Sequence, residues 1–345
     1  MKRLLVTGGC GFIGSHFIRQ WLARYPDARI TNLDKLTYAG NRENLRDLER
    51  HPGYALIQGD IADRSTVNAA VQGCEAIVNF AAESHVDRSI TDAAPFLQTN
   101  YVGVAVLLEA ARAHAVTRFL QVSTDEVYGS VAEGAAREDD ALCPSSPYAA
   151  TKAAADLLVQ AYHATHGLPT VITRGSNTFG PHQYPEKIIP LFITNLMEGA
   201  TLPLYGDGQQ RRDWLYVQDH VDAIETVLLR GAPGAIYNIS GQQELANREL
   251  ATAILSALGG TEASIERVPD RPGHDRRYAV DGARLAELGW HPRVPFPQAL
   301  RETVQWYQAH ADWWKPLKEQ LRADPYHWLN RTARPGLTRQ VGVRA

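Results

Sequence analysis

The chain has 345 residues, which is long for one domain and sufficient for two. Apolar residues make up 44% of it and charged residues 21%, the composition of a soluble globular protein with a large core. The net charge of −3 gives no sign of a surface for nucleic acid or for a membrane, so we expect neither as a partner.

The N-terminus and the cysteines favour the cytoplasm. Only three apolar residues stand in a row before the first glycine, too few for a signal peptide, and no apolar span of 18 residues occurs. Cys10, Cys74 and Cys143 lack the spacing of a disulfide framework or a metal site. His163 and His166 have ligand spacing on one helix, but no third ligand accompanies them. We therefore expect a cytoplasmic protein without a metal.

A glycine-rich turn follows the first predicted strand, residues 4–6, and precedes an amphipathic run at residues 12–25 that predicts a helix. It satisfies both G-x-G-x-x-G and G-x-x-G-x-x-G. The glycines are Gly8, Gly9, Gly11 and Gly14. Such glycines let a pyrophosphate approach backbone N–H groups at a helix N-terminus. Strand, turn and helix together predict a dinucleotide site.

The second predicted strand, residues 28–33, ends in Asp34, which stands 20 residues after Gly14. A carboxylate at this position accepts hydrogen bonds from the ribose hydroxyls of NAD and repels the 2′-phosphate of NADP. We therefore expect NAD as the cofactor. The alternative role for Asp34 is that of a helix cap or a loop acid.

Strands and helices continue to alternate through the first half of the chain. After strand 54–57 come Asp60 and Ile61, where an adenine would lie. A long helix is predicted at 96–114, and further strands at 76–80 and 118–123. This order predicts an α/β fold of the Rossmann type, a doubly wound parallel sheet whose ligands bind at the carboxyl ends of its strands.

Tyr148 and Lys152 stand four residues apart in a helix predicted at residues 146–165, with Pro147 near its first turn. At this spacing the two side chains share one helix face. An unperturbed Tyr titrates near about 10, and a neighbouring ammonium lowers its pKa, so the phenolate becomes a usable base. Such a base suits removal of a proton from an alcohol as hydride leaves for a nicotinamide.

Thr124, Asp125 and Glu126 directly follow the strand predicted at residues 118–123, again at a carboxyl end of the sheet. A simple alcohol dehydrogenase has no need of an acidic pair. One acid and one base beside a redox centre predict that water is eliminated as well. The alternative is a solvated pair of loop acids.

The regular alternation stops after a strand at residues 170–173. Residues 174–213 are rich in Gly, Pro, Asn and Tyr, a composition that suits loops around a polar ligand. The remaining predictions are strands at 214–217 and 236–239 and helices near 219–229, 247–258 and 297–310.

We expect two domains from this organisation. A Rossmann domain that binds NAD takes residues 1–174 with a return segment at about 214–240. A smaller, mixed α/β C-terminal domain that binds the substrate takes residues 175–213 and 241–330. Residues 331–345 contain arginines and no acid, and we expect a flexible tail.

These motifs resemble the extended short-chain dehydrogenase/reductases and, within them, the dTDP-glucose 4,6-dehydratase family. The resemblance spans roughly residues 2–310. The strings that carry it are LDKLTYAGN (33–41), AAESHVDRSI (81–90), STDEVYG (123–129), PEKIIP (185–190), RDWLYV (212–217) and DRPGHDRRY (270–278).

The resemblance implies an NAD-dependent lyase that acts on dTDP-glucose. Tyr148 would take the proton of the sugar C4 hydroxyl, assisted by Lys152 and Thr124, as hydride passes from C4 to NAD⁺. Glu126 would remove the C5 proton, Asp125 would protonate the departing C6 hydroxyl, and hydride would return to C6. The product would be dTDP-4-keto-6-deoxy-glucose. Asp125 must then hold a proton near neutral pH, whereas Glu126 must not.

The resemblance also implies two sets of ligand residues. For the cofactor they are Gly8, Gly11, Phe12, Ile13, Gly14, Asp34, Lys35, Thr37, Asp60, Ile61, Ala81, Ala82, Ser84, Thr99, Tyr148 and Lys152. For the nucleotide sugar they are Ser84, Thr124, Asn177, Lys187, Arg212, Asn247, Arg271 and His274. Arg and Lys are the usual partners of a diphosphate.

Other functions remain open at this point. A dehydratase for another nucleotide sugar, a 4-epimerase or a decarboxylase would share the glycines, the Tyr and the Lys, but the last two have no need of Asp125 and Glu126. A non-catalytic NAD-sensing module is the alternative from another class. Helices 96–114 and 146–165 carry apolar residues beyond one core face. Family members pair such helices across a dimer interface, so we expect a homodimer.

Overall fold

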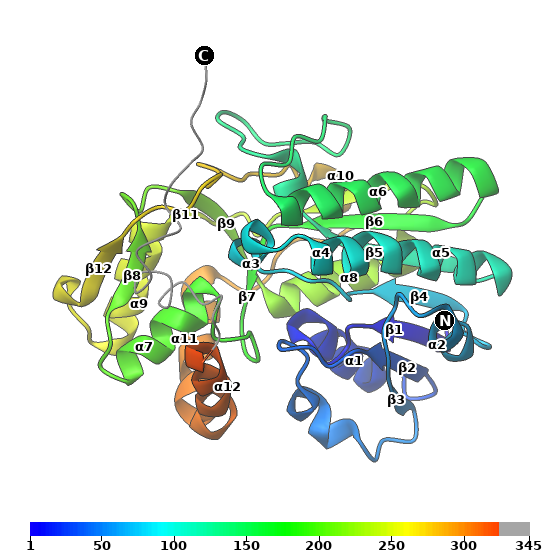
Figure 1. Ribbon diagram of the computed structural model, residues 1–345, viewed down its shortest axis with the longest axis horizontal. Helices are drawn as coiled ribbons and strands as arrows, with labels where there is room; N and C mark the ends of the chain where they lie inside the picture. Colours follow the sequence, from blue (N-terminus) through cyan, green and yellow to red (C-terminus); the bar gives the residue numbers. More distant parts are fainter. Residues whose placement is uncertain (324–345) are drawn as a thin grey trace.

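A seven-stranded parallel sheet forms the larger part of the computed structural model, which describes residues 1–323 (Figure 1). The predicted tail, residues 331–345, lies outside the described residues. The strands are β1 (Arg3–Thr7), β2 (Arg29–Asp34), β3 (Tyr54–Gln58), β4 (Ala76–Asn79), β5 (Arg118–Thr124), β6 (Thr170–Gly175) and β10 (Ile236–Ile239). Their order is β10-β6-β5-β4-β1-β2-β3, and all neighbours are parallel. The predicted Rossmann-type fold is confirmed.

Helices cover both faces of this sheet because its strands are apolar on both sides. In β1, Leu4 and Val6 belong to one core and Leu5 to the other, as the two-residue period of a strand requires. The first core is covered by α1 (Phe12–Arg24) and α8 (Val217–Arg230). The second is covered by α2 (Arg64–Ala70), α5 (Val104–Ala113) and α6 (Pro147–His166).

The helix predicted at residues 96–114 is present over residues 94–113, but it is not α-helical throughout. It consists of α4 (Ala94–Leu97), a π-helical segment η2 (Gln98–Gly103) and α5. The buried side chain of Asn100 accepts from the Glu83 backbone N–H at 2.9 Å and donates to the Glu83 carbonyl at 3.0 Å. These bonds tie the wider turn to the segment after β4, a tertiary contact that helical periodicity does not reveal.

The smaller part of the molecule contains two short sheets and its own apolar core (Figure 1). Strands β7 (Asn177–Phe179), β9 (Arg211–Tyr216) and β11 (Glu244–Ala246) form one sheet, and β8 (Leu202–Tyr205) and β12 (Ile265–Val268) the other. Its helices are α7 (Ile188–Met197), α9 (Asn247–Leu258), α11 (Phe296–Ala309) and α12 (Ala311–Ala323). Short segments elsewhere are η1 (Arg42–Leu48), α3 (Val86–Thr91), η3 (Asp125–Tyr128), η4 (Glu262–Ser264) and α10 (Ala283–Ala286).

The chain crosses between the two parts more than once. After β7, β8 and β9 in the smaller sheets, α8 and β10 return to the seven-stranded sheet. Strand β9 pairs with β7 and β11, so the return to the large sheet begins with α8. The division into two domains stays a prediction. Within residues 1–323, none of the helices has the length and apolar character needed to cross a membrane.

Candidate active site

A cleft of about 320 Å³ opens at the carboxyl ends of the parallel strands. Every residue of the predicted cofactor set lines it, as do Thr124, Asp125 and Glu126. Parallel strands place the loops that follow them at one edge of the sheet, so motifs far apart in sequence meet here. The cleft therefore contains the motifs that suggested a dinucleotide and the motifs that suggested catalysis.

The glycine turn leaves a space that a side chain would fill. Gly8 has φ +68°, and a Cβ there would lie 2.6 Å from the backbone nitrogen of Ala81. At Gly14 a Cβ would lie 2.6 Å from the Gly8 carbonyl oxygen. At Gly11, beside the N-terminus of α1, the Gly8 carbonyl is the only heavy atom near such a Cβ. The turn is tightly packed at Gly8 and Gly14 and open at Gly11, which fits a pyrophosphate bound to backbone N–H groups.

Asp34, at the end of β2, points its carboxylate toward this turn. Its Oδ2 accepts from the Cys10 N–H and its Oδ1 from the Leu36 N–H, both at 2.8 Å. A carboxylate oxygen has two acceptor sites, so each oxygen can accept a further hydrogen bond from a ribose hydroxyl. Lys35 forms an ion pair with Asp60 at 2.7 Å on the same side of the cleft. These residues fit the adenosine half of NAD.

Helix α6 positions Tyr148 and Lys152 at the inner end of the cleft. Ser146 caps the helix by accepting from the Ala149 N–H at 3.1 Å, and Pro147 occupies its first turn. Both functional side chains are buried, and Lys152 Nζ donates to the Val122 carbonyl at 2.7 Å. The helix start therefore fixes Tyr148 and Lys152 against β5.

The protonation of this pair differs from the sequence-based expectation. We expected the Lys152 ammonium to lower the pKa of Tyr148. In the protein alone, burial raises the pKa of Tyr148, and the Glu126 carboxylate raises it further, while the Thr124 hydroxyl lowers it. Burial lowers the pKa of Lys152 to about 8. Periodicity gives the spacing of the pair and not the depth at which it is buried.

Asp125 and Glu126 lie in the short turn η3, which begins where β5 ends. Thr124 caps this turn by accepting from the Glu126 N–H at 3.3 Å. Burial raises the pKa of Asp125 well above its usual value, and the neighbouring Glu126 carboxylate adds to the rise. Burial also raises the pKa of Glu126, but the charges of Arg271, Arg212 and Lys187 oppose it. These surroundings favour the protonated form of Asp125 more than the protonated form of Glu126.

The predicted sugar-nucleotide residues fall into two groups. Ser84, Asn177 and Lys187 line the cleft, where Lys187 Nζ donates to the Ser84 carbonyl at 2.9 Å. Four residues lie in the smaller part and do not line it: Arg212, Asn247, Arg271 and His274.

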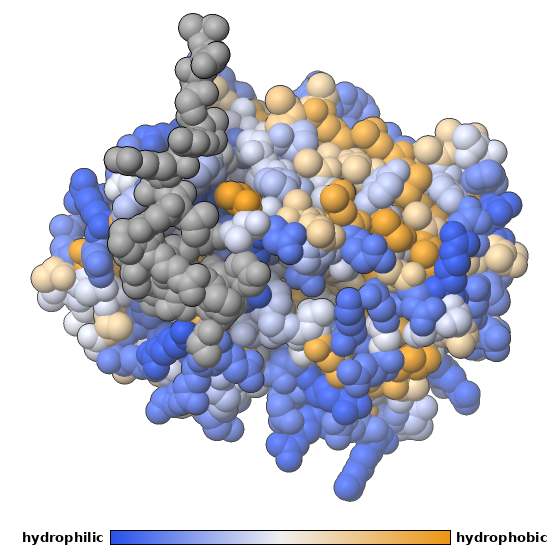
Figure 2. Space-filling model, in the orientation of Figure 1, coloured by the Kyte–Doolittle hydropathy of each residue, from blue (hydrophilic) through white to orange (hydrophobic). Residues whose placement is uncertain are grey.

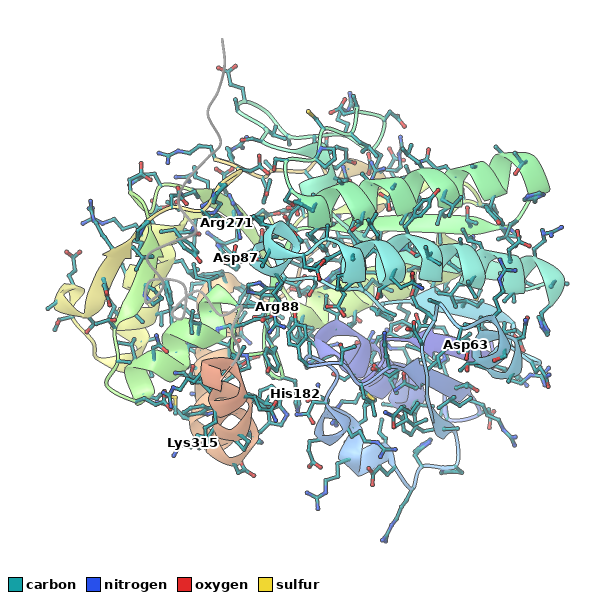
Figure 3. The ribbon with its side chains drawn as sticks, in the orientation of Figure 1. Asp63, Asp87, Arg88, His182, Arg271 and Lys315 are labelled. Atoms are coloured by element: carbon teal, nitrogen blue, oxygen red, sulfur yellow. The ribbon has the colours of Figure 1, made fainter. Side chains whose placement is uncertain are left out.

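Two of these four act on the cleft by charge. Arg212 stacks over the ring of Tyr278 at 4.1 Å, and Arg271 pairs with Asp87 of α3 at 3.2 Å (Figure 3). Both guanidinium groups lower the pKa of Glu126, so they lie close to it. Asn247 begins α9, and His274 contacts Asp270 at 2.6 Å.

Further cleft residues were not predicted from the sequence. Glu83 and Glu186 stand inside two of the strings that carry the resemblance, AAESHVDRSI and PEKIIP, so their position was visible but no role was expected of their side chains. Thr178 and Gln183 lie in the segment 174–213 that was expected to surround a polar ligand, but no role was expected of their side chains, and His220 belongs to no motif. His220 reaches the cleft only when α8 returns to the sheet, and its Nδ1 lies 2.7 Å from the Thr178 hydroxyl. All five residues line the cleft.

No group of three His, Cys, Asp or Glu side chains among residues 1–323 could hold a metal ion. His163, one of the two histidines with ligand spacing, instead contacts the Leu168 carbonyl through Nδ1 at 2.9 Å.

Comparison with known proteins agrees with this geometry. The family model of the GDP-mannose 4,6-dehydratases matches residues 5–303. Over 321 residues, the chain is 53% identical to a dTDP-glucose 4,6-dehydratase of Streptomyces niveus, covering 92% of this chain and 96% of that protein. The chain belongs to the dTDP-glucose 4,6-dehydratase family.

Solved structures extend the likeness to three dimensions. The dTDP-glucose 4,6-dehydratase of Streptomyces venezuelae, solved with NAD bound, matches with a TM-score of 0.90 at 51% identity, covering 91% of this chain and 99% of that one. A UDP-glucose 4-epimerase of Thermus thermophilus in complex with NAD matches with a TM-score of 0.82 at 32% identity, covering 89% and 99%. The fold is thus shared by dehydratases and epimerases, and the site has to distinguish them.

Proposed function

We propose that this protein is a dTDP-glucose 4,6-dehydratase that uses NAD and forms dTDP-4-keto-6-deoxy-glucose. The observation that carries the proposal is the pair Asp125 and Glu126 beside Tyr148: Asp125 is buried, whereas Glu126 is half-buried and three cationic side chains oppose the rise of its pKa. A 4-epimerase of the same fold needs the Tyr and the Lys, but its reaction removes no C5 proton and expels no hydroxyl. Neighbouring carboxylates with separated pKa values are the arrangement that acid and base chemistry requires.

NAD would be held by the glycine turn and by Asp34. When bound, it supplies a reversible two-electron acceptor and a positive charge on its oxidised ring. Lys152 and Thr124 would favour the Tyr148 phenolate, because an ammonium and a hydroxyl donor both stabilise a buried anion. Tyr148 would then take the proton of the C4 hydroxyl as C4 becomes a ketone.

Elimination follows from the ketone at C4, which acidifies the C5 proton. Glu126 would take that proton as a carboxylate, since three cationic side chains favour its charged form. Asp125 would hold a proton at neutral pH and give it to the C6 hydroxyl, which leaves as water. Lys187 lies in the cleft and Arg271 behind Glu126, where they would bind the diphosphate of the nucleotide sugar.

The decisive experiment is to incubate the purified protein with dTDP-glucose and no added cofactor. We expect a product lighter by one water, with the alkaline absorbance of a 4-keto sugar and no net change in cofactor redox state. An unchanged mass with a new configuration at C4 would make the protein an epimerase. Parallel incubations with UDP-glucose and GDP-mannose test the nucleotide, and turnover of either in preference to dTDP-glucose would reassign the substrate.

We also propose that the protein is a homodimer that pairs through the helices beside the cleft. Figure 2 shows apolar side chains gathered over α5 and α6. Leu97 at the end of α4 and Leu157 on α6 are 53% and 58% exposed, and Tyr101 and Val102 of η2, which leads into α5, are exposed as well. A contiguous apolar surface of this kind marks an interaction site. A cytoplasmic location is part of the same proposal, supported by three cysteines that are all unpaired in the structure.

A further inference from the structure

Helix α6 carries a third buried polar residue, Asp156, one turn beyond Lys152. Tyr148, Lys152 and Asp156 stand four residues apart, so their side chains follow one another along a single helix face. Lys152 is 4% exposed and Asp156 is completely buried. An ionised carboxylate held away from water is strongly unfavourable unless it is paired, so its place behind a catalytic lysine calls for an explanation.

Arg174 of β6 fixes the Asp156 carboxylate in position. Its Nε donates to Asp156 Oδ2 at 2.8 Å, and the guanidinium is itself only 1% exposed. Arg174 Nη1 also donates to the Tyr128 hydroxyl at 2.7 Å and to the Glu138 carbonyl at 3.3 Å. Arg174 is therefore held by Asp156 of α6, by Tyr128 of η3 and by the Glu138 backbone. The Asp156 carboxylate is fixed in place by this arginine. Among residues 1–323, Asp156 Oδ1 has no hydrogen-bond partner within 3.5 Å, and the Ser123 side chain is the group that faces the carboxylate.

Lys152 is surrounded by little that would stabilise its charge. Its Nζ donates to the Val122 carbonyl, and burial lowers its pKa to about 8, with the Asp156 carboxylate acting in the opposite direction. Ser123 of β5 also faces Asp156. Charged groups on the other elements packed against α6 have partners other than Lys152. Asp87 and Arg88 lie on α3, and Glu109 lies on α5. Asp125 and Glu126 lie on η3 and face Tyr148.

We propose that Asp156, anchored by Arg174, is a positioning residue that keeps Lys152 protonated beside Tyr148. This proposal rests on the role of Lys152 in the proposed function. The spacing suits this role, because a helix that rises 1.5 Å per residue sets Asp156 about 6 Å from Lys152 and about 12 Å from Tyr148 along its axis. A carboxylate at these distances favours the ammonium more than it opposes the phenolate, because charge interactions weaken with distance.

A single and a double variant test the proposal. Asp156→Asn alone leaves the Arg174 charge buried without a partner, which can prevent folding. The double variant Asp156→Asn/Arg174→Gln removes both charges and keeps the volumes similar, so the protein is expected to fold. Asp156→Glu keeps the carboxylate and serves as the matched control.

The first readout is the titration of Lys152 itself, followed by NMR with lysine labelled with ¹³C at Cε and assigned with Lys152→Arg. We expect the midpoint to fall by about one pH unit in the double variant, a tenfold change in the ratio of ammonium to amine, and to stay unchanged in Asp156→Glu. The second readout is kcat/KM against pH. Its alkaline limb should move to lower pH by the same amount.

A folded double variant with the titration midpoint and the alkaline limb of the unmodified protein would overturn the proposal and leave the ion pair with a structural role. The titration needs no sugar substrate. A protein that shows the Lys152 shift but does not dehydrate dTDP-glucose would therefore refute the proposed function and retain the inference about Asp156.

Discussion

Two residues that are adjacent in sequence can meet different environments, and Asp125 and Glu126 do so. Asp125 is turned into the protein, where burial disfavours its charge. Glu126 faces three cationic side chains, all of which come from the smaller part of the molecule. A turn immediately after a strand allows this, because successive residues there point in different directions. The acid and the base of the elimination can thus be supplied by one short segment.

Substituting the two carboxylates one at a time should distinguish proton removal at C5 from the loss of water at C6. Glu126→Gln removes the base, so exchange of the C5 proton with deuterated solvent should stop. Asp125→Asn keeps the base and should retain exchange while losing the release of water. We expect turnover to fall by about 10² to 10⁴ in both. Mass spectrometry of the sugar in D₂O measures both effects. Equal exchange in the two variants would contradict the assignment of roles.

The pH dependence of the reaction should reveal the cations around Glu126. In the proposed reaction Glu126 acts as a carboxylate, so activity should rise as pH increases through its pKa. Because Arg271 lowers that pKa, Arg271→Gln should move the acid limb of kcat/KM to higher pH. Arg276→Gln is the control, since Arg276 pairs with Asp207 on the surface. A limb that moves equally in both variants, or in neither, would show that Arg271 does not act on Glu126.

The element proposed to hold the dinucleotide is the turn between β1 and α1, whose shape is set by the backbone rather than by side chains. The positive φ of Gly8 is costly for any residue with a Cβ, and the adjacent Ala81 backbone leaves no room for one. The turn therefore requires a residue without a Cβ at position 8.

Gly8→Ala should abolish cofactor binding, since the turn cannot keep its shape. Gly134 has the same φ of +68° with nothing within 4 Å of a Cβ, so Gly134→Ala measures the backbone cost alone. We expect Gly134→Ala to lose about 1 to 2 kcal/mol of stability and to keep its NAD. NAD released by heat from each purified variant, per protomer, is the measurement. Equal NAD content in the two variants would contradict the role given to Gly8.

The elements that could be predicted from the sequence are those with a strong local pattern. Strands of the large sheet contain apolar runs, several of which are followed by glycine or acid, and α9 begins and ends as predicted, at Asn247 and Leu258. Strands β7 and β11 have three residues each and exist only through pairing with β9, so no local pattern indicates them. The π-helical segment η2 depends on Asn100, a contact distant in sequence.

The same distinction holds for the site. Residues at the ends of parallel strands could be predicted to meet, because the topology of the fold brings them to one edge. The depth of burial could not, and it decides the pKa of Tyr148 and Lys152. Nor could the partners of Arg212 and Arg271, because Tyr278 and Asp87 are both distant from them in sequence. Their roles and those of the other site residues stay predictions.

At the scale of the whole molecule, the surface divides into a face that is free to pair and a face that is not. Leu157 on α6 is 58% exposed, and Leu229 on α8, across the sheet, is 41% exposed. Only the first lies among other exposed apolar side chains of α4, η2 and α6. Assembly should therefore use one side of the sheet.

Leu157→Glu should convert a dimer into a monomer, because it places a charge in the proposed interface. Leu229→Glu is the matched control on the opposite side and should leave the dimer intact. Light scattering after size-exclusion chromatography gives the mass of each. A monomeric unmodified protein, or a dimer lost with Leu229→Glu instead, would rule out pairing through α5 and α6.

The return of α8 and β10 to the large sheet also determines when, during synthesis of the chain, this sheet can finish folding. A nascent chain that ends after β6 has every glycine of the turn and both catalytic helix residues, yet the core beside Leu4 and Phe17 still lacks Val221, Ile224 and Ile239. N-terminal domains generally fold while the rest of the chain is still being made. The first half of this protein cannot do so, because its apolar face is not yet covered. It has to wait until residue 239 has emerged, with the smaller sheets partly made in between.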